Sequence, residues 1–290
     1  MSASEFEGTA VLGAGTMGHG IAQVLAQAGH RVRLHDPGAG AVEQGLDRIR
    51  RNLEKGVSIG KVTPEQRDAA LSRIGEADSV SEAARGASVV IEAAPESLEL
   101  KRELFGAVEA EVTPSALLAT NTSSLSIDAI AGGLEHPERF LGLHFFNPVH
   151  IMALVEVVHG PRTSEATRER GIALVRGLGK EPIVVRDSPG FASSRLGVAL
   201  GLEAMRMVEE GVASPTDIDK AMELGYRHPM GPLKLTDLVG LDVRLGIAEY
   251  LHETLGQAHF EPPTILREMV AEGRLGKKSG RGFYDWEDQG

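Results

Sequence analysis

Residues 9–36 read TAVLGAGTMGHGIAQVLAQAGHRVRLHD, and this stretch decides the fold of the first part of the chain. Its apolar start, Thr9–Leu12, predicts a buried strand that leads into the glycine pattern G-x-G-x-x-G. Residues 16–28 have a helical composition and stop at Gly29, and residues 31–35 alternate like a second strand. A strand, a glycine turn, a helix and a second strand make one βαβ unit of the Rossmann type.

Each glycine of the pattern has its own physical role. Gly13 permits the tight turn after the strand, Gly15 lets a pyrophosphate approach the backbone, and Gly18 lets the helix pack closely on the strand. Thr16 and Met17 stand where the helix begins, and the free N–H groups at a helix N-terminus bind phosphates. The pattern therefore predicts a dinucleotide site.

An acid at the end of the second strand predicts which dinucleotide binds. Asp36 directly follows the alternating residues 31–35. A carboxylate at this place accepts hydrogen bonds from the adenosine ribose hydroxyls and repels a 2′-phosphate. The sequence therefore favours NAD over NADP.

The alternation of strands and helices continues as far as residue 186. Short β-rich runs are separated by helical segments such as 97–111. This order calls for an α/β fold with a doubly wound, mainly parallel sheet and helices on both of its faces. The further strands are expected at Val89–Glu92, Leu117–Thr120, 140–144, 155–158 and 182–186.

A turn-rich segment, DSPG at 187–190, ends this pattern. The rest of the chain has helical composition, so we expect a Rossmann domain at 1–187 and an all-α domain at 188–290. The helices of the second domain are expected at 191–210, 216–223, 239–254 and 264–272.

The composition narrows the class of protein. With 290 residues, 42% of them hydrophobic and 24% charged, the chain suits two globular domains. Its formal net charge of −11 argues against nucleic acid as a partner, because a phosphate backbone needs a basic face. The absence of cysteine excludes disulfides and thiolate metal sites, and the histidines show no metal-ligand spacing. No apolar run approaches the roughly 18 residues that span a bilayer, and residues 1–8 lack the features of an export signal, so we expect a soluble cytoplasmic protein with no membrane partner.

His144 is the best-placed candidate for proton transfer. It ends an expected strand, where open α/β sheets collect their ligands, and the pKa of histidine suits a base at neutral pH. Its segment, HFFNPVHIMALVEVV at 144–158, is accompanied by NTSSLS at 121–126, HPMGP at 228–232 and GRLGKKSGRGFYDW at 273–286. In these motifs and their order the chain resembles the 3-hydroxyacyl-CoA dehydrogenase family, particularly the bacterial 3-hydroxybutyryl-CoA dehydrogenases.

The resemblance implies an NAD-dependent enzyme of fatty-acid metabolism that interconverts the 3-hydroxyl and 3-keto groups of a short acyl thioester. It implies that His144 is the base in oxidation and the acid in reduction, and that Glu156 orients its ring. Ser123 is then expected to hold the substrate hydroxyl, and Asn121 and Asn147 to position the nicotinamide half of the cofactor. The helical domain is expected to bind substrate and to form a homodimer.

The resemblance assigns two further residues to the cofactor site, and the apolar surroundings of Glu156 give a separate expectation. Glu96 and Lys101 stand where the family contacts its cofactor. The apolar neighbours of Glu156 predict a buried strand, in which an unpaired carboxylate is costly. A partner for Glu156 is therefore expected.

The sequence departs from the family at Ser194. The family carries Asn in the segment PGFxxNR, whereas residues 189–195 read PGFASSR. This change has three alternative explanations. In the first, Ser194 or a water beside it replaces the Asn that reaches toward the substrate. In the second the enzyme is slow, and in the third the site accepts an acyl group with an added polar substituent such as a 2-hydroxyl.

A second departure concerns the carrier of the acyl group. The family often has a lysine pair near Ser58 and Ile59, close to the CoA nucleotide, and neither of these positions is basic here. Basic residues are retained nearby at Arg48, Arg50, Arg51, Lys55 and Lys61, and Lys55 is expected to contact the substrate. One explanation is sequence drift on a solvent-exposed face. The alternative is that an acyl carrier protein, and not CoA, delivers the acyl group, because its acidic surface would bind a basic patch. Relatives in antibiotic pathways oxidise a glyceryl group on such a carrier toward hydroxymalonyl units. A third alternative is a protein that binds NAD without catalysis.

Overall fold

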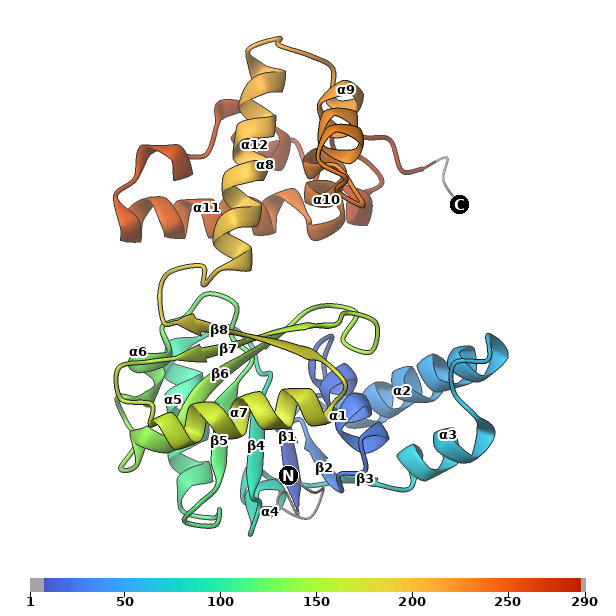
Figure 1. The fold of residues 1–290 in the computed structure, drawn as a ribbon, viewed down its shortest axis with the longest axis vertical. Helices are drawn as coiled ribbons and strands as arrows, with labels where there is room; N and C mark the ends of the chain where they lie inside the picture. Colours follow the sequence, from blue (N-terminus) through green and yellow to red (C-terminus); the bar gives the residue numbers. More distant parts are fainter. Residues whose placement is uncertain (1–7, 288–290) are drawn as a thin grey trace. The chain divides into compact units, whose positions relative to one another are not determined.

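The computed structural model describes residues 8–287, and the chain divides into two compact units at Asp187 and Ser188 (Figure 1). The first unit is a sheet covered by helices, and the second is built from helices. This confirms the expected α/β fold followed by an all-α region. Among residues 8–287, no helix is long and apolar enough to cross a membrane.

The first unit contains one eight-stranded sheet with the order β3-β2-β1-β4-β5-β6-β7-β8. All neighbouring strands are parallel except β6 and β7, which run in opposite directions. The order reverses at β1, and the carboxyl ends of the strands beside such a switch point form the crevice where this class of sheet binds ligands. The strands are β1 Thr9–Leu12, β2 Val32–His35, β3 Ile74–Glu76, β4 Val89–Glu92, β5 Leu117–Thr120, β6 Phe140–Phe145, β7 Leu154–His159 and β8 Glu181–Arg186.

Apolar side chains on both faces of the strands explain why the sheet is buried. Every residue of β1, β4, β5 and β6 is buried, as is usual for strands covered on both sides. On one face, Val11 and Ile91 join a core that also includes Leu25 of helix α1, Gly18–Gln27. On the other face, Phe140 packs edge-on against Phe105 of helix α5, Leu98–Glu109, with ring centroids 4.7 Å apart.

The helices of the first unit connect its strands. Two of them, α1 and α5, lie within a few residues of the helices predicted at 16–28 and 97–111. Several others begin at a Ser or Thr whose side chain accepts a hydrogen bond from a backbone N–H of the first turn. The helices are α1 Gly18–Gln27, α2 Ala41–Ser58, α3 Pro64–Leu71, α4 Val80–Ala84, α5 Leu98–Glu109, α6 Ile127–Ala131, η2 Pro137–Arg139 and α7 Glu165–Gly177.

The second unit packs its helices around an apolar core that includes Leu202, Met205, Leu233 and Leu251. The expected helix at 239–254 is α11, Leu241–Leu255, which lies within two residues of the predicted bounds. Gly240, with a φ of 104°, separates it from α10, Pro232–Val239. Its helices are α8 Ser193–Glu209, α9 Pro215–Lys220, the π-helix η3 Ala221–Gly225, α10 Pro232–Val239, α11 Leu241–Leu255, η4 Ala258–Phe260, α12 Thr264–Ala271 and η5 Lys277–Ser279.

Candidate active site

The loop between β1 and α1 has a shape that only glycine permits at two positions. Gly13 has a φ of 101°, and a Cβ added there lies 2.6 Å from the carbonyl oxygen of Ala93. A Cβ on Gly18 lies 1.8 Å from the carbonyl oxygen of Gly13. A Cβ on Gly15, in contrast, meets no protein atom within 4 Å, so this stretch of backbone is open to a ligand. The loop therefore fits a pyrophosphate.

Three side chains around this loop differ in their surroundings. Asp36 accepts hydrogen bonds from the backbone N–H groups of Ala14 (2.8 Å) and Gly38 (2.9 Å). Its carboxylate therefore lies beside the glycine loop, at the end of β2. Thr16 is exposed, whereas Met17 packs against the hydrophobic core and so offers a ligand mainly its backbone.

The carboxyl ends of β4, β5 and β6 are joined by Asn121. Its backbone N–H donates to the carbonyl of Glu92 (2.7 Å), and its Oδ1 accepts from the N–H of Phe145 (3.0 Å). These bonds fix the Asn121 side chain between neighbouring strand ends. Its amide is therefore held one residue from His144, on the next strand of the sheet.

His144 and Glu156 form a buried pair. They face each other across the antiparallel strands β6 and β7, and His144 Nδ1 lies 2.7 Å from Glu156 Oε2. An ionised carboxylate only accepts hydrogen bonds, so Nδ1 carries the proton of this bond. The Glu156 side chain is 0% exposed and that of His144 is 9% exposed. The apolar neighbours of Glu156 thus correctly predict both its burial and its need for a partner.

Glu96 organises the segment that contains Ser123. One of its oxygens, Oε1, accepts hydrogen bonds from the Thr122 hydroxyl (2.5 Å) and the Ser123 N–H (3.1 Å). Burial of Glu96 raises the pKa of its carboxyl, but hydrogen bonds from Thr122 and the charge of Lys101 outweigh that effect. The pKa of Glu96 is therefore held below its usual value, and this side chain stays ionised while it shapes the segment.

Lys101 is placed differently from the cofactor-facing residue that the sequence predicts. Its side chain is only 1% exposed, and its Nζ lies 2.6 Å from Glu92 Oε1 and 3.4 Å from Glu96 Oε2. Glu92 is also buried and accepts from the hydroxyl of Thr120 (2.6 Å). Lys101 is therefore a buried counter-ion that supports Glu96 from behind. Sequence reasoning missed Glu92, although an acid at the end of the apolar run VVIE signals a buried carboxylate.

The remaining expected residues are spread over both units. Asn147 is exposed on the connection between β6 and β7, and its bond to Pro148 is cis. Lys55 is exposed near the end of α2. Ser194 lies in the first turn of α8, in the helical unit. The structure therefore brings His144, Glu156 and Asn121 together within the first unit.

Lys55 borders a cavity of about 540 Å³. The cavity has a positive environment, because Lys61 also lines it. Burial lowers the pKa of His150, and the neighbouring charges of His19 and Lys180 lower it further. The cavity is lined by Gln23, Gln27, Asn52, Lys55, Gly56, Ile59, Lys61, Val62, Pro148, His150 and Ile151.

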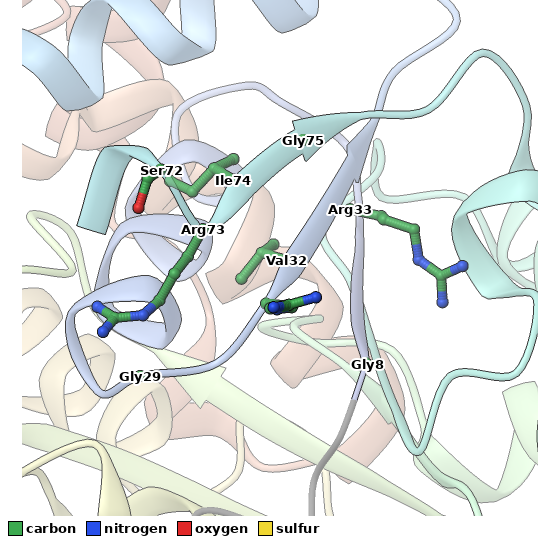
Figure 2. Close-up of a pocket in the computed structure, with 9 residues that line it drawn as sticks. Gly8, Gly29, Val32, Arg33, Ser72, Arg73, Ile74 and Gly75 are labelled. Atoms are coloured by element: carbon green, nitrogen blue, oxygen red, sulfur yellow. The ribbon is translucent and has the colours of Figure 1, made fainter. Parts of the chain in front are cut away.

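A separate cavity of about 650 Å³ lies near the starts of β2 and β3 and contains three arginines, Arg31, Arg33 and Arg73 (Figure 2). The guanidinium groups of Arg33 and Arg73 point away from each other. Arg33 donates to the carbonyls of Glu82 and Arg85, and Arg73 donates to the carbonyl of Ala26. These two arginines hold neighbouring segments together and do not converge on a common ligand position.

Comparisons with known proteins agree with this geometry. A family model described as "3-hydroxyacyl-CoA dehydrogenase, NAD binding domain" matches residues 8–188, and the model of the family's C-terminal domain matches residues 190–286. The chain is 45% identical to a probable 3-hydroxybutyryl-CoA dehydrogenase of Bacillus subtilis, over 96% of this chain and 97% of that protein. It is 44% identical to a 3-hydroxybutyryl-CoA dehydrogenase of Mycobacterium tuberculosis, over 95% and 97%. Its fold is similar to the crystal structure of (S)-3-hydroxybutyryl-CoA dehydrogenase from Ralstonia eutropha, with a TM-score of 0.93 and 40% identity over 98% of this chain and 100% of that one.

Proposed function

The chain belongs to the 3-hydroxyacyl-CoA dehydrogenase family, and from this premise we propose how its residues oxidise the 3-hydroxyl of a short acyl-CoA thioester. The observation that carries the proposal is the buried pair of His144 and Glu156. The enzyme is an NAD-dependent oxidoreductase, as its relatives are.

His144 is the general base of the proposed reaction. Its Nδ1–H bond to Glu156 directs the opposite nitrogen, Nε2, toward the substrate, where it accepts the proton of the 3-hydroxyl group. The imidazolium that forms is stabilised by the Glu156 carboxylate, in the same way as the orienting acid of a catalytic triad. Bound NAD supplies the acceptor for the hydride that leaves C3. In the reverse reaction His144 returns the proton to the new hydroxyl.

Three polar residues position the reacting groups. Ser123 holds the substrate hydroxyl by a hydrogen bond, and the contacts of Glu96 with residues 122–124 support this position. Asn121 and Asn147 orient the nicotinamide half of the cofactor. The hydrogen bond that fixes the Asn121 amide supports its role in positioning the nicotinamide, because a preorganised group needs no rearrangement in the transition state.

The glycine loop and Asp36 bind the adenosine half of NAD. The open backbone at Gly15 admits the pyrophosphate, and Thr16 and Met17 contribute backbone N–H groups at the start of α1. Asp36 accepts hydrogen bonds from the ribose hydroxyls. Its position beside the loop supports this role.

Lys55 and its cavity receive the phosphate-bearing end of the thioester. The positive environment there supports this placement, and Ser194 in the first turn of α8 contacts the acyl end. An acyl carrier protein remains the alternative carrier, because its phosphopantetheine arm ends in the same thioester.

Formation of NADH by the purified protein, followed by its absorbance, tests the proposal with (S)-3-hydroxybutyryl-CoA and NAD. Rapid turnover is expected, and His144→Ala is expected to lower kcat by about 10²- to 10⁴-fold, the range for general base catalysis. A protein that binds NAD but oxidises only carrier-bound hydroxyacyl groups supports the alternative carrier. A His144→Ala protein with normal turnover contradicts the assignment of the base.

A homodimer formed through the helical unit completes the proposal. Its support is the number of large apolar side chains that this unit exposes in a single chain. They are Leu196, Val212, Leu224, Tyr226, Leu235, Leu238, Val239 and Val243. A monomeric mass by light scattering at micromolar concentration contradicts it. The cytoplasmic location and the place in fatty-acid metabolism stay predictions.

A further inference from the structure

Glu92, the last residue of β4, lies between the two halves of the proposed cofactor site. In the strand register it stands beside Leu12 of β1 on one side and Thr120 of β5 on the other (Figure 1). Leu12 precedes the glycine loop, and Thr120 precedes the segment 121–124, which we call the serine segment. Glu92 is therefore in contact with the strands that lead into both parts of the site.

The carboxylate of Glu92 is 0% exposed and accepts hydrogen bonds with both of its oxygens. Its Oε1 accepts from the Ala94 N–H and from Lys101 Nζ, each at 2.6 Å. Its Oε2 accepts from the Thr120 hydroxyl, also at 2.6 Å. One buried carboxylate thus joins the loop after β4, the helix α5 and the end of β5.

The bond to Thr120 continues into the serine segment. The buried Thr120 hydroxyl donates to Glu92, and its oxygen accepts a hydrogen bond from the N–H of Thr122 at 3.2 Å. The hydroxyl of Thr122 in turn donates to Glu96, at 2.5 Å. Glu96 shares the counter-ion Lys101 with Glu92. Two carboxylates with one common cation therefore hold the serine segment.

Stability alone does not explain this arrangement of charges. A buried ion pair loses the hydration of both ions, and apolar residues of similar volume often replace such a pair without loss of stability. The pair lies at the carboxyl ends of the strands beside the switch point of the sheet, where this class of fold binds its ligands. A rigid support has the largest effect at such a place, because small misplacements of reacting groups slow a reaction strongly.

We infer that Glu92 is a positioning residue of the enzyme, which acts through Thr120 to hold the serine segment in place for hydride transfer. This inference rests on the proposed function, in which Asn121 orients the nicotinamide and Ser123 holds the substrate hydroxyl. Because Glu92 has no exposed surface, it touches neither ligand. Loss of its link to the segment should therefore slow the reaction without weakening the grip on the adenosine half of NAD.

Thr120→Val is the first test, because it removes the link and keeps the ion pair and the shape of the side chain. Stopped-flow absorbance of NADH with (S)-3-hydroxybutyryl-CoA gives the rate constant of the first turnover. This rate constant is expected to fall by about 10- to 100-fold, the effect of a misplacement of about 1 Å. The dissociation constant of ADP-ribose, which lacks the nicotinamide, should stay at the wild-type value. Thr120→Ser keeps the hydroxyl and should restore most of the rate.

The first turnover separates positioning from a loss of folded protein. A smaller folded fraction lowers the amplitude of the first turnover and the number of ADP-ribose sites, but it leaves the rate constant unchanged. Thr9→Val is the matched control. Thr9 is a buried threonine of the neighbouring strand β1, and its hydroxyl makes no hydrogen bond with any residue of 8–287. This variant should keep the wild-type rate constant.

Glu92→Gln is the second test, and it decides if Thr120→Val does not fold. Glutamine has one acceptor oxygen where Glu92 uses two, so its NH2 group faces a donor and one bond of the network is lost. A fall in the rate constant with unchanged ADP-ribose binding is expected again. A wild-type rate constant in either variant, or a loss of amplitude alone, overturns the inference and leaves the proposed function intact. Absence of turnover by the wild type overturns both.

Discussion

Replacement of Glu156 by glutamine isolates the charge of the proposed orienting acid. The Glu156 carboxylate is fully buried and lies 2.7 Å from His144 Nδ1. In Glu156→Gln the amide oxygen still accepts the Nδ1–H bond, so the ring keeps its tautomer and its orientation. What is lost is the negative charge that faces the imidazolium formed in the transition state. The substitution therefore separates electrostatic stabilisation from positioning.

The expected size of the effect follows from the geometry. A hydrogen bond to a charged group contributes about 1.5–3 kcal/mol, and a tenfold change in rate corresponds to about 1.4 kcal/mol. The glutamine amide keeps a neutral hydrogen bond of about 0.5–1.5 kcal/mol, so the loss is about 1–1.5 kcal/mol and the kcat of Glu156→Gln should fall by about 5- to 15-fold. Glu156→Ala should fall further, because it also removes the acceptor that fixes the ring. The KM for NAD should stay close to the wild-type value in both, since Asp36 and the glycine loop are unchanged.

Steady-state NADH formation with saturating (S)-3-hydroxybutyryl-CoA measures kcat, and titration of NAD measures the KM. Glu181→Gln is the matched control, because Glu181 is an exposed acid at the start of the neighbouring strand β8. It should behave as the wild type. A Glu156→Gln enzyme whose kcat lies within twofold of the wild type refutes the reasoning, and so does an effect confined to the KM for NAD.

Three further predictions concern the support of the site. Lys101→Met leaves Glu92 buried and without its counter-ion, so the free energy of unfolding, measured by urea denaturation, should fall by about 3–5 kcal/mol. The double variant Lys101→Met/Glu92→Leu should recover most of this loss. A double variant that recovers none of it contradicts the pairing. The lowered pKa of Glu96 means that its contribution to stability is present above its unfolded pKa and is lost as pH falls through its folded pKa. The stability difference between wild type and Glu96→Gln should therefore shrink from about pH 7 to about pH 3, and a constant difference argues against it. Asp36→Ser should raise the KM for NAD by about 10-fold and that for NADP less, whereas equal increases contradict the role of the carboxylate.

The sequence predicts the start of the fold well because three local signals coincide there. Thr9–Leu12 is a largely apolar run, Gly13 and Gly18 occupy positions that exclude a Cβ, and Gly29 closes the helix with a φ of 101°. The apolar run and the positive φ of Gly13 and Gly29 are local features of the chain, whereas the close approach at Gly13 is to Ala93 of a distant segment. Short helices such as α3 and α4 carry no strong apolar period, and their main signals are the caps Thr63 and Ser79. The apolar pattern of the sequence therefore does not predict these two helices.

Lys101 shows where sequence reasoning stops. Lysine is almost never fully buried without a partner, so its position in a polar helix predicts an exposed side chain. The burial of Lys101 depends on Glu92, the last residue of the preceding strand β4, and on the packing of α5 against the sheet. Neither the distance between those elements nor the direction of the side chain follows from composition. The sequence identifies the charged residues around Glu96, and only the structure shows which of them face inward.

The pair of His144 and Glu156 was predictable as a pair, but its geometry depends on the one antiparallel step in the sheet. Glu156 is near the start of β7, and His144 is near the end of β6. If β7 ran parallel to β6, the start of β7 would lie at the amino end of the sheet, and Glu156 would lie away from His144. The return of the chain through residues 146–153 instead places Glu156 directly opposite His144 in the strand register. Because side chains alternate between faces, a slip of one residue would turn the carboxylate away from the ring. The apolar residues on either side of Glu156, Val155 and Val157, face the core and fix that register, so the same packing that stabilises the sheet also sets the distance between the base and its acid.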